Sequence, residues 1–196
     1  IVPGKKSALT KRPIPLSKPP AVKAPAKLED VAFWSVTEVG QLLKTRQVTS
    51  VALTEMYLNR LKRLNAKLNC VVTFTDELAM KQAKQADTEI AAGRYRGPLH
   101  GIPWGCKDII AKSGYKTTWG AAPYKEQVVN EDATIVKRLE NAGAVLIAKL
   151  TTGELAGGDY WFGGQTKNPW NLEQGSSGSS GGTASATAAR MVWVLG

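Results

Sequence analysis

Three stretches in the first half of the chain carry apolar residues at helical spacing. The first begins at Ser35 and Glu38, which have the spacing of a capping box. The second follows Ser50 and is amphipathic, with these apolar residues predicted on one side: Val51, Met56, Leu61 and Leu64. The third covers residues 76–92, where alanines recur at helical spacing before Gly93. Together these stretches predict a helical layer at the start of the fold.

The second half of the chain consists of short apolar pieces separated by glycine. Asp132 is placed to cap a helix whose apolar residues fall within 135–139. After a glycine turn, the apolar run 144–148 predicts a short buried strand. A helix, a glycine turn and a buried strand make an α/β unit with a parallel or mixed sheet. The Ala-rich residues 183–195 predict one more helix.

Charge separates a basic tail from the body of the chain. The formal net charge is +10, and residues 1–28 hold seven lysines and arginines without an acid, which leaves +3 for the rest. This segment is also rich in proline and alanine, so we expect a disordered tail over 1–28 and a folded domain over 29–196. A membrane or nucleic-acid tether is the alternative interpretation of the tail. Nucleic acid is not expected as a partner of the body, because +3 is not the excess of cations that a nucleic-acid-binding face would cluster on one surface.

Composition indicates a soluble protein of the reducing cytoplasm. The chain has 196 residues, of which 43% are apolar, and no apolar run approaches the ~20 residues of a membrane span. Cys70 and Cys106 fit neither a disulfide framework nor a zinc site. The first residues resemble no secretory signal. Position 1 is Ile1 and not an initiator methionine, so the natural N-terminus is expected upstream.

The densest run of glycine and serine lies at 175–182. A flexible linker has this composition. This run, however, lies between an Asn-Pro-Trp-Asn segment at 168–171 and an Ala-rich helix. A glycine-rich turn at the start of a helix also presents N–H groups to anionic or polarised oxygens. A phosphate loop is the third interpretation, but the run lacks the Gly-Lys-Ser/Thr ending of that motif.

Lys107 stands in the apolar stretch 101–110. Burial would lower its pKa, and a neutral lysine can act as a general base. The alternative is that Lys107 pairs with Asp108 or another carboxylate. His100 is the only histidine and is expected to be a local packing or hydrogen-bonding residue. Cys106 is expected to be a buried thiol, because nothing nearby in the sequence would activate it.

These segments together resemble the amidase-signature family. Its members place a catalytic lysine in a Gly-Ile-Pro…Lys-Asp motif and follow it with a Gly-Gly-Ser-Ser-Gly-Gly loop. Here the motifs fall at 101–108 and 178–182. Further similar segments lie at 117–120, 143–149, 153–156 and 168–170. The resemblance covers roughly residues 29–189 and implies the N-terminal part of that fold, a mixed sheet flanked by helices and preceded by a helical layer.

The resemblance also implies a chemistry. By position, Lys107 would be the base and Ser179 the bridging serine of a Ser–cis-Ser–Lys triad that cleaves amides through an acyl-enzyme. Four neighbours would form the surrounding substrate-binding loop: Gly178, Ser180, Gly181 and Gly182. The attacking serine and the oxyanion hole belong to a motif beyond Gly196, so we expect an inactive N-terminal fragment of a longer enzyme. No metal or organic cofactor is implied.

Three functions remain open at this point. The first is a free-standing amidase for a small-molecule or acyl amide, as a monomer or a homo-oligomer, and the basic tail and residues 160–164 favour it. The second is the A subunit of a glutamyl-tRNA amidotransferase, which works with partner subunits. The third is a truncated pseudo-enzyme or binding module. The resemblance weakens after Ala189, where Arg190 replaces a usual glycine, so the last seven residues are expected to come from a truncated, frame-shifted or mis-spliced reading. Ordinary divergence followed by an early stop is the alternative.

Overall fold

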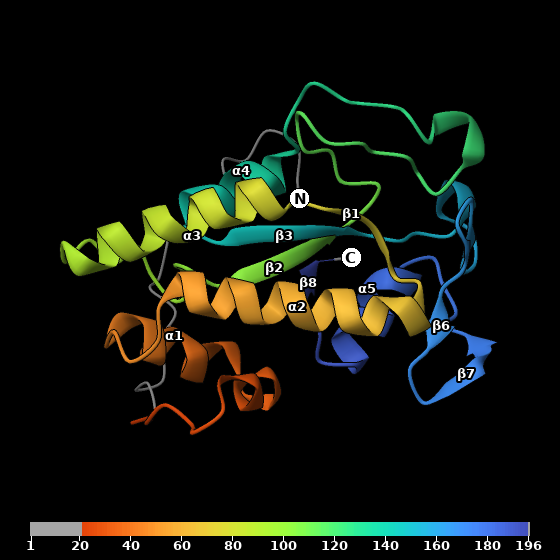
Figure 1. Cartoon of the computed structure of the whole chain (residues 1–196). Coiled ribbons are helices and arrows are strands. Elements are labelled where there is room, and N and C mark those ends of the chain that lie inside the picture. The colour runs from red at the N-terminus through yellow and green to blue at the C-terminus, as the bar shows by residue number, and fades with distance from the viewer. Residues whose placement is uncertain (1–20, 196) are drawn as a thin grey trace, which may run out of the picture.

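A four-stranded mixed sheet lies at the centre of the computed structural model, which describes residues 21–195 (Figure 1). The strands run in the order β1-β3-β2-β8, with these bounds: β1 Val71–Phe74, β2 Pro103–Lys107, β3 Val145–Leu150 and β8 Trp193–Leu195. β2 is parallel to both of its neighbours, whereas β1 is antiparallel to β3. The prediction of an α/β fold with a mixed sheet is confirmed.

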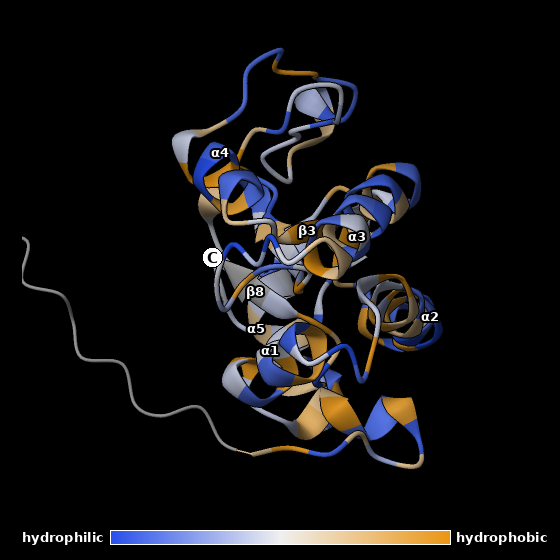
Figure 2. Cartoon of the chain, turned by 90° about the vertical axis from the view of Figure 1, so that its left-hand side faces the viewer, coloured by the Kyte–Doolittle hydropathy of each residue, from blue (hydrophilic) through white to orange (hydrophobic). Residues whose placement is uncertain are grey.

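Helices of mixed hydropathy cover both faces of this sheet (Figure 2). A 3₁₀ helix at Leu28–Phe33 is followed by five α-helices: α1 Val36–Lys44, α2 Ser50–Leu68, α3 Asp76–Ala91, α4 Thr134–Asn141 and α5 Gly181–Ala188. Buried side chains of α1, α2, α3 and α5 form the larger hydrophobic core with one face of the sheet. On the other face, α4 packs against Trp104, Cys106 and Leu146. The sheet therefore separates two apolar clusters.

Local signals set the helix ends close to where the sequence predicts them. The capping box is present, because Ser35 Oγ accepts from Glu38 N and Glu38 Oε2 accepts from Ser35 N. α3 ends one residue before the predicted boundary, and Gly93 follows with φ at +77°. The predicted helical layer is confirmed.

The buried stripe of α2 differs from the predicted one. Val51, Met56 and Leu64 are only partly buried. The residues that α2 buries in the core are Leu53, Tyr57, Leu58, Leu61 and Leu68. Tyr57 packs on Trp193 of β8, with 4.9 Å between the ring centroids. Packing against Trp193 of β8 fixes which side of α2 faces the core, and residue spacing alone does not predict this contact.

Two predictions in the second half of the chain are wrong. Asp132 does not cap α4, because its carboxylate accepts from Lys112 Nζ and Ser113 N at 2.9 and 2.7 Å. The helix predicted over 183–195 ends at Ala188. Arg190 then takes a left-handed conformation, with φ at +54°, and the chain enters β8 beside β2. The predicted strand at 144–148 is confirmed as β3, which extends to Leu150.

The predicted tail overlaps the described residues only at 21–28. There Val22 and Ala24 pack against the core, and Gln47 bonds the main chain of both. Residues 1–20 lie outside the described part, and the disorder predicted there stays a prediction. Short pieces complete the chain: 3₁₀ helices Ala122–Tyr124 and Glu154–Ala156, and hairpin strands Tyr160–Trp161, Gly164–Gln165, Lys167–Asn168 and Asn171–Gly175. Within residues 21–195, no helix is both long and apolar enough to cross a membrane.

Candidate active site

Lys107 is the last residue of β2, at the carboxyl end of the parallel part of the sheet. Its neighbour on β3 is Leu150, and every residue of β2 is buried. Side chains that follow the carboxyl ends of parallel strands commonly form binding sites, because connecting loops meet there. The Lys107 side chain leaves this strand end with only 5% of the residue exposed. Its burial, proposed from the apolar sequence around it, is observed.

The amine of Lys107 meets two hydroxyl groups. Lys107 Nζ lies 2.9 Å from Ser179 Oγ and 2.9 Å from Ser180 Oγ. Lys107 is therefore brought together with two serines that lie 72 and 73 positions later in the sequence. Burial lowers the pKa of Lys107 below its ordinary value, since desolvation disfavours the charged amine. A buried amine with two hydroxyl partners can exchange a proton with either of them.

Lys107 forms no ion pair within residues 21–195, so the alternative that it pairs with Asp108 is wrong. Asp108 points elsewhere and pairs with Lys149, whose Nζ lies 2.8 Å from Asp108 Oδ1. Both residues of this pair are fully buried. Asp108 Oδ2 also accepts from Thr118 N and Thr118 Oγ1. The nearest carboxylate in sequence is thus occupied, and no other carboxylate in the described part of the chain pairs with the Lys107 amine.

The Gly/Ser segment 175–182 is packed and is not a flexible linker. A Cβ atom on Gly178 would lie 1.7 Å from Gly158 O, and one on Gly182 would lie 2.3 Å from Thr151 N. Only glycine allows this approach of main chain to main chain. The peptide bond between Gly178 and Ser179 is cis. Gly181 and Gly182 are buried at the start of α5.

Three residues that hold this loop in place are not predicted as site residues by the sequence: Thr152, Gly153 and Asp159. Asp159 Oδ2 accepts from Ser177 N at 2.9 Å. Ser179 O accepts from Thr152 Oγ1 at 3.1 Å and from Gly153 N at 3.2 Å. Similarity to the family marks the segment that begins at Gly153 but assigns it no role. For Thr151 and Thr152, the indication in the sequence is that two polar residues directly follow a buried strand.

His100 lies outside this site and has a structural environment. Its Nδ1 accepts from Arg96 N at 3.1 Å, and its Nε2 lies 3.2 Å from Glu89 Oε2. Burial lowers the pKa of this histidine, more than the Glu89 carboxylate raises it. The expectation of a packing and hydrogen-bonding histidine is confirmed.

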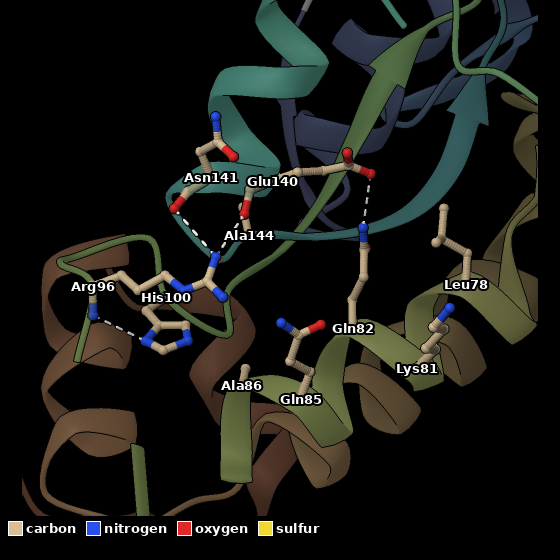
Figure 3. A pocket seen from close by; sticks show the side chains of 11 residues that line it. Leu78, Lys81, Gln82, Gln85, Ala86, Arg96, His100, Glu140, Asn141 and Ala144 are labelled. Carbon is tan, nitrogen blue, oxygen red and sulfur yellow. Dashed lines mark hydrogen bonds between the residues drawn. The ribbon is translucent and has the colours of Figure 1, made fainter. Parts of the chain in front are cut away.

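His100 lines a pocket of about 300 Å³ between α3 and the end of α4 (Figure 3). Lys107 and Ser179 are absent from its walls. The Arg96 guanidinium bonds Glu89 and the carbonyl oxygens of Glu140 and Asn141. The Arg96 guanidinium is thus engaged by its neighbours, and the candidate site stays at the end of β2.

The two cysteines are expected to resist thiol reagents in the folded protein. Both thiols are buried, and this burial raises the pKa of Cys70 and of Cys106 to about 12. An aromatic disulfide reagent at pH 8 should therefore release no colour from these positions until denaturant is added. Fast labelling of Cys106 without denaturant would contradict this and would reopen its role as a nucleophile.

Comparison with known proteins places most of the chain in one family. Residues 52–194 match the family model described as Amidase. The A subunit of glutamyl-tRNA(Gln) amidotransferase from Coxiella burnetii is 40% identical over 161 residues, or 81% of this chain and 33% of that protein. The protein of the same name from Azoarcus sp. is 42% identical over an equal length and coverage. The native peptide amidase of Stenotrophomonas maltophilia superposes with a TM-score of 0.77 at 33% identity, covering 84% of this chain and 36% of that one.

The extent of these matches concerns two expectations: that the chain is a fragment of a longer enzyme, and that its last seven residues have a different origin. The chain spans about one third of the length of the curated relatives that it matches. The family match continues through residue 194 and so includes Arg190 and Trp193. Trp193 also opens β8, which pairs with β2. The expectation that the last seven residues come from a truncated, frame-shifted or mis-spliced reading stays a prediction.

Proposed function

This chain belongs to the amidase family, and from this membership we propose that the full-length protein cleaves amide bonds through an acyl-enzyme. Lys107 would be the base and Ser179 the bridging serine. The observation that carries the proposal is the 2.9 Å contact of a buried lysine amine, which pairs with no carboxylate of residues 21–195, with Ser179 Oγ. The substrate would be a small-molecule or acyl amide.

The two hydroxyl contacts of Lys107 would have different roles. A neutral amine has one lone pair and two N–H groups, so it can accept a proton from Ser179 while it donates to Ser180 Oγ. Ser179 would in turn take the proton of the attacking serine, which the family resemblance places beyond Gly196. The attacking oxygen bonds the amide carbon, and the C–N bond breaks as the proton returns to the leaving nitrogen. Water then releases the acid.

The remaining residues of the loop would shape this site. Gly178 and Gly182 allow the loop to lie against main chain that a side chain would block. Gly181 starts α5, so the loop leads directly into a helix. We propose that residues 1–196 alone are inactive, because the attacking serine belongs to the motif beyond them.

Amide hydrolysis can be tested on the full-length protein from its natural source. Ammonia release from simple primary amides, such as propionamide and benzamide, should be catalytic. A fluorophosphonate probe should add one label per molecule, on a serine outside residues 1–196. Residues 1–196 expressed alone should show neither reaction. A label on Ser179 itself, or hydrolysis by residues 1–196 alone, would contradict the assigned roles.

The rate should rise with pH through a pKa below that of ordinary lysine. Burial lowers the pKa of Lys107, and only the neutral amine can accept the proton of Ser179. Activity is therefore expected to be lost as pH falls through the lowered pKa of Lys107 and to reach a plateau above it. The profile of kcat/KM against pH measures this. A rate that falls with rising pH across the same range would exclude a neutral lysine base.

The amidotransferase role is the second candidate, and the curated relatives favour it. Proteins of 40–42% identity are named as A subunits of glutamyl-tRNA(Gln) amidotransferase, whereas the peptide amidase is 33% identical. In this role, the ammonia would pass to a glutamyl-tRNA and the protein would purify with partner subunits. Release of free ammonia by the isolated full-length protein would favour the amidase. Transfer to glutamyl-tRNA that requires a co-purifying partner would favour the second role.

A further inference from the structure

Thr152 connects the central sheet to the main chain of Ser179. It follows the last residue of β3 by two positions and is 1% exposed. Its Oγ1 donates to Ser179 O at 3.1 Å and also has Gly153 O within reach as an acceptor at 3.2 Å. Gly153 N donates to the same oxygen at 3.2 Å. Two successive residues thus hold one carbonyl group of the Gly/Ser loop.

Strand register explains why Thr152 lies at this place. β3 pairs in parallel with β2, and Leu150 lies beside Lys107. The chain that continues beyond Leu150 therefore passes the point where Lys107 Nζ contacts Ser179 Oγ. Ser179 is consequently held from two adjacent strands, with its side chain bonded from β2 and its main chain bonded from the extension of β3.

Close packing of main chain leaves little room for other side-chain supports. A Cβ atom on Gly153 would lie 2.0 Å from Gly158 O, and one on Gly178 would lie 1.7 Å from the same oxygen. Within residues 21–195, Thr152 provides the one side-chain hydrogen bond to the Ser179 carbonyl. Loss of this hydroxyl would leave the carbonyl with Gly153 N alone.

We propose that Thr152 is a positioning residue, which holds the main chain of Ser179 so that Ser179 Oγ stays within proton-transfer distance of Lys107 Nζ. The proposal rests on the proposed function for its effect on rate. The contact itself is independent of any substrate. Proton transfer between two such groups depends steeply on their separation, so a small shift of Ser179 is enough to slow the reaction.

The test compares three variants of the full-length protein. Thr152→Val removes the hydroxyl at nearly constant volume and is expected to lower kcat about tenfold with KM unchanged. Thr152→Ser keeps the hydroxyl and should retain most of the rate. Thr75→Val is the matched control, because Thr75 is equally buried and its Oγ1 donates to Leu146 O at 2.7 Å. It should leave kcat unchanged.

A double-mutant cycle separates positioning from a general structural role. When Ser179 is already replaced by alanine, Thr152→Val should cost no further rate, because no hydroxyl remains to be positioned. An additional loss in that background would overturn the proposal. So would unchanged kcat for Thr152→Val, or an equal loss for Thr75→Val.

A second measurement stays decisive if the wild-type protein hydrolyses no amide and the proposed function fails. The pKa of Lys107 can be followed by NMR of its labelled side chain. Thr152→Val should raise this pKa toward its ordinary value, because a displaced Ser179 admits water to the amine. Thr152→Ser and Thr75→Val should leave it where it is. An unchanged pKa in Thr152→Val would overturn the positioning role without reference to activity.

Discussion

Lys107→Met in the full-length protein is expected to lower kcat by about 10²–10⁴-fold. A positioned general base contributes a factor of that order, and methionine fills a similar volume without a lone pair of comparable basicity. KM should change little, since Lys107 contacts Ser179 and Ser180 and its proposed role begins after binding. Lys107→Arg should be as inactive as Lys107→Met, because a guanidinium keeps its proton.

The fold of the Lys107→Met variant should be at least as stable as the wild type near neutral pH. The folded-state pKa of Lys107 is depressed. The protonated amine is therefore better accommodated in the unfolded chain, and the stability cost is present at low pH and disappears as pH rises toward about 10.5. Methionine removes this cost, although it also removes the amine that contacts Ser179 Oγ and Ser180 Oγ.

Three measurements check this prediction. Steady-state kinetics give kcat and KM, and thermal unfolding gives Tm for the same preparations. Lys137→Met is the control, because Lys137 lies on α4 with more than half of its side chain exposed. It should preserve the rate. A Lys107→Met enzyme with normal kcat would remove lysine from the proposed mechanism, whereas a lost rate together with a collapsed Tm would indicate only a misfolded site.

The parts of the fold that sequence could predict are those set by neighbouring residues. The Ser35–Glu38 capping box and Gly93 lie at helix ends, and both act within a few positions of the chain. β8 could not be predicted in this way. Residues 193–195 follow an Ala-rich helix, and they form a strand only because β2 offers a free edge some ninety positions earlier. Long-range pairing overrides a local tendency in that case.

The site was predictable as two motifs but not as one arrangement. The Gly/Ser motif indicates an unusual main-chain geometry, and the other motif indicates a lysine with a lowered pKa. The family resemblance connects the two motifs.

The partner of Lys107 is open in the sequence between the Gly/Ser loop and Asp108. Because neighbouring residues at a strand end point to opposite sides, Lys107 and Asp108 were poor candidates for a pair from the start. Alternation along β2 would have resolved this alternative. The place of Thr152 directly after a buried strand does not reveal its contact with Ser179, since that contact depends on where β3 ends relative to β2.

Lys149→Met is expected to lower the free energy of unfolding by about 3–5 kcal/mol. Lys149 and Asp108 are fully buried, and the 2.8 Å ion pair between them joins β3 to the residue after β2. Lys149 Nζ also donates to Lys116 O and Thr117 Oγ1, at 2.9 and 3.1 Å. Methionine leaves the Asp108 carboxylate buried without its counter-charge, and desolvation of an unpaired charge is the dominant cost.

The same chemical change at an exposed ion pair provides the matched control. Lys62 pairs with Asp76, and each side chain is more than 40% exposed. Lys62→Met should change the free energy of unfolding by no more than about 1 kcal/mol, because water already screens that pair. Urea unfolding of the full-length protein measures both variants.

A third variant separates the charge from the packing around it. Adding Asp108→Leu to Lys149→Met removes the uncompensated carboxylate and should recover part of the lost stability. Full recovery is not expected, because Thr118 N donates to Asp108 Oδ2 at 2.9 Å and would lose its acceptor. If the double variant is less stable than Lys149→Met alone, the hydrogen bonds of Asp108 outweigh its charge. The hydrogen bonds of this network to residues 116–118 would then contribute more to the free energy of unfolding than the ion pair between Lys149 and Asp108.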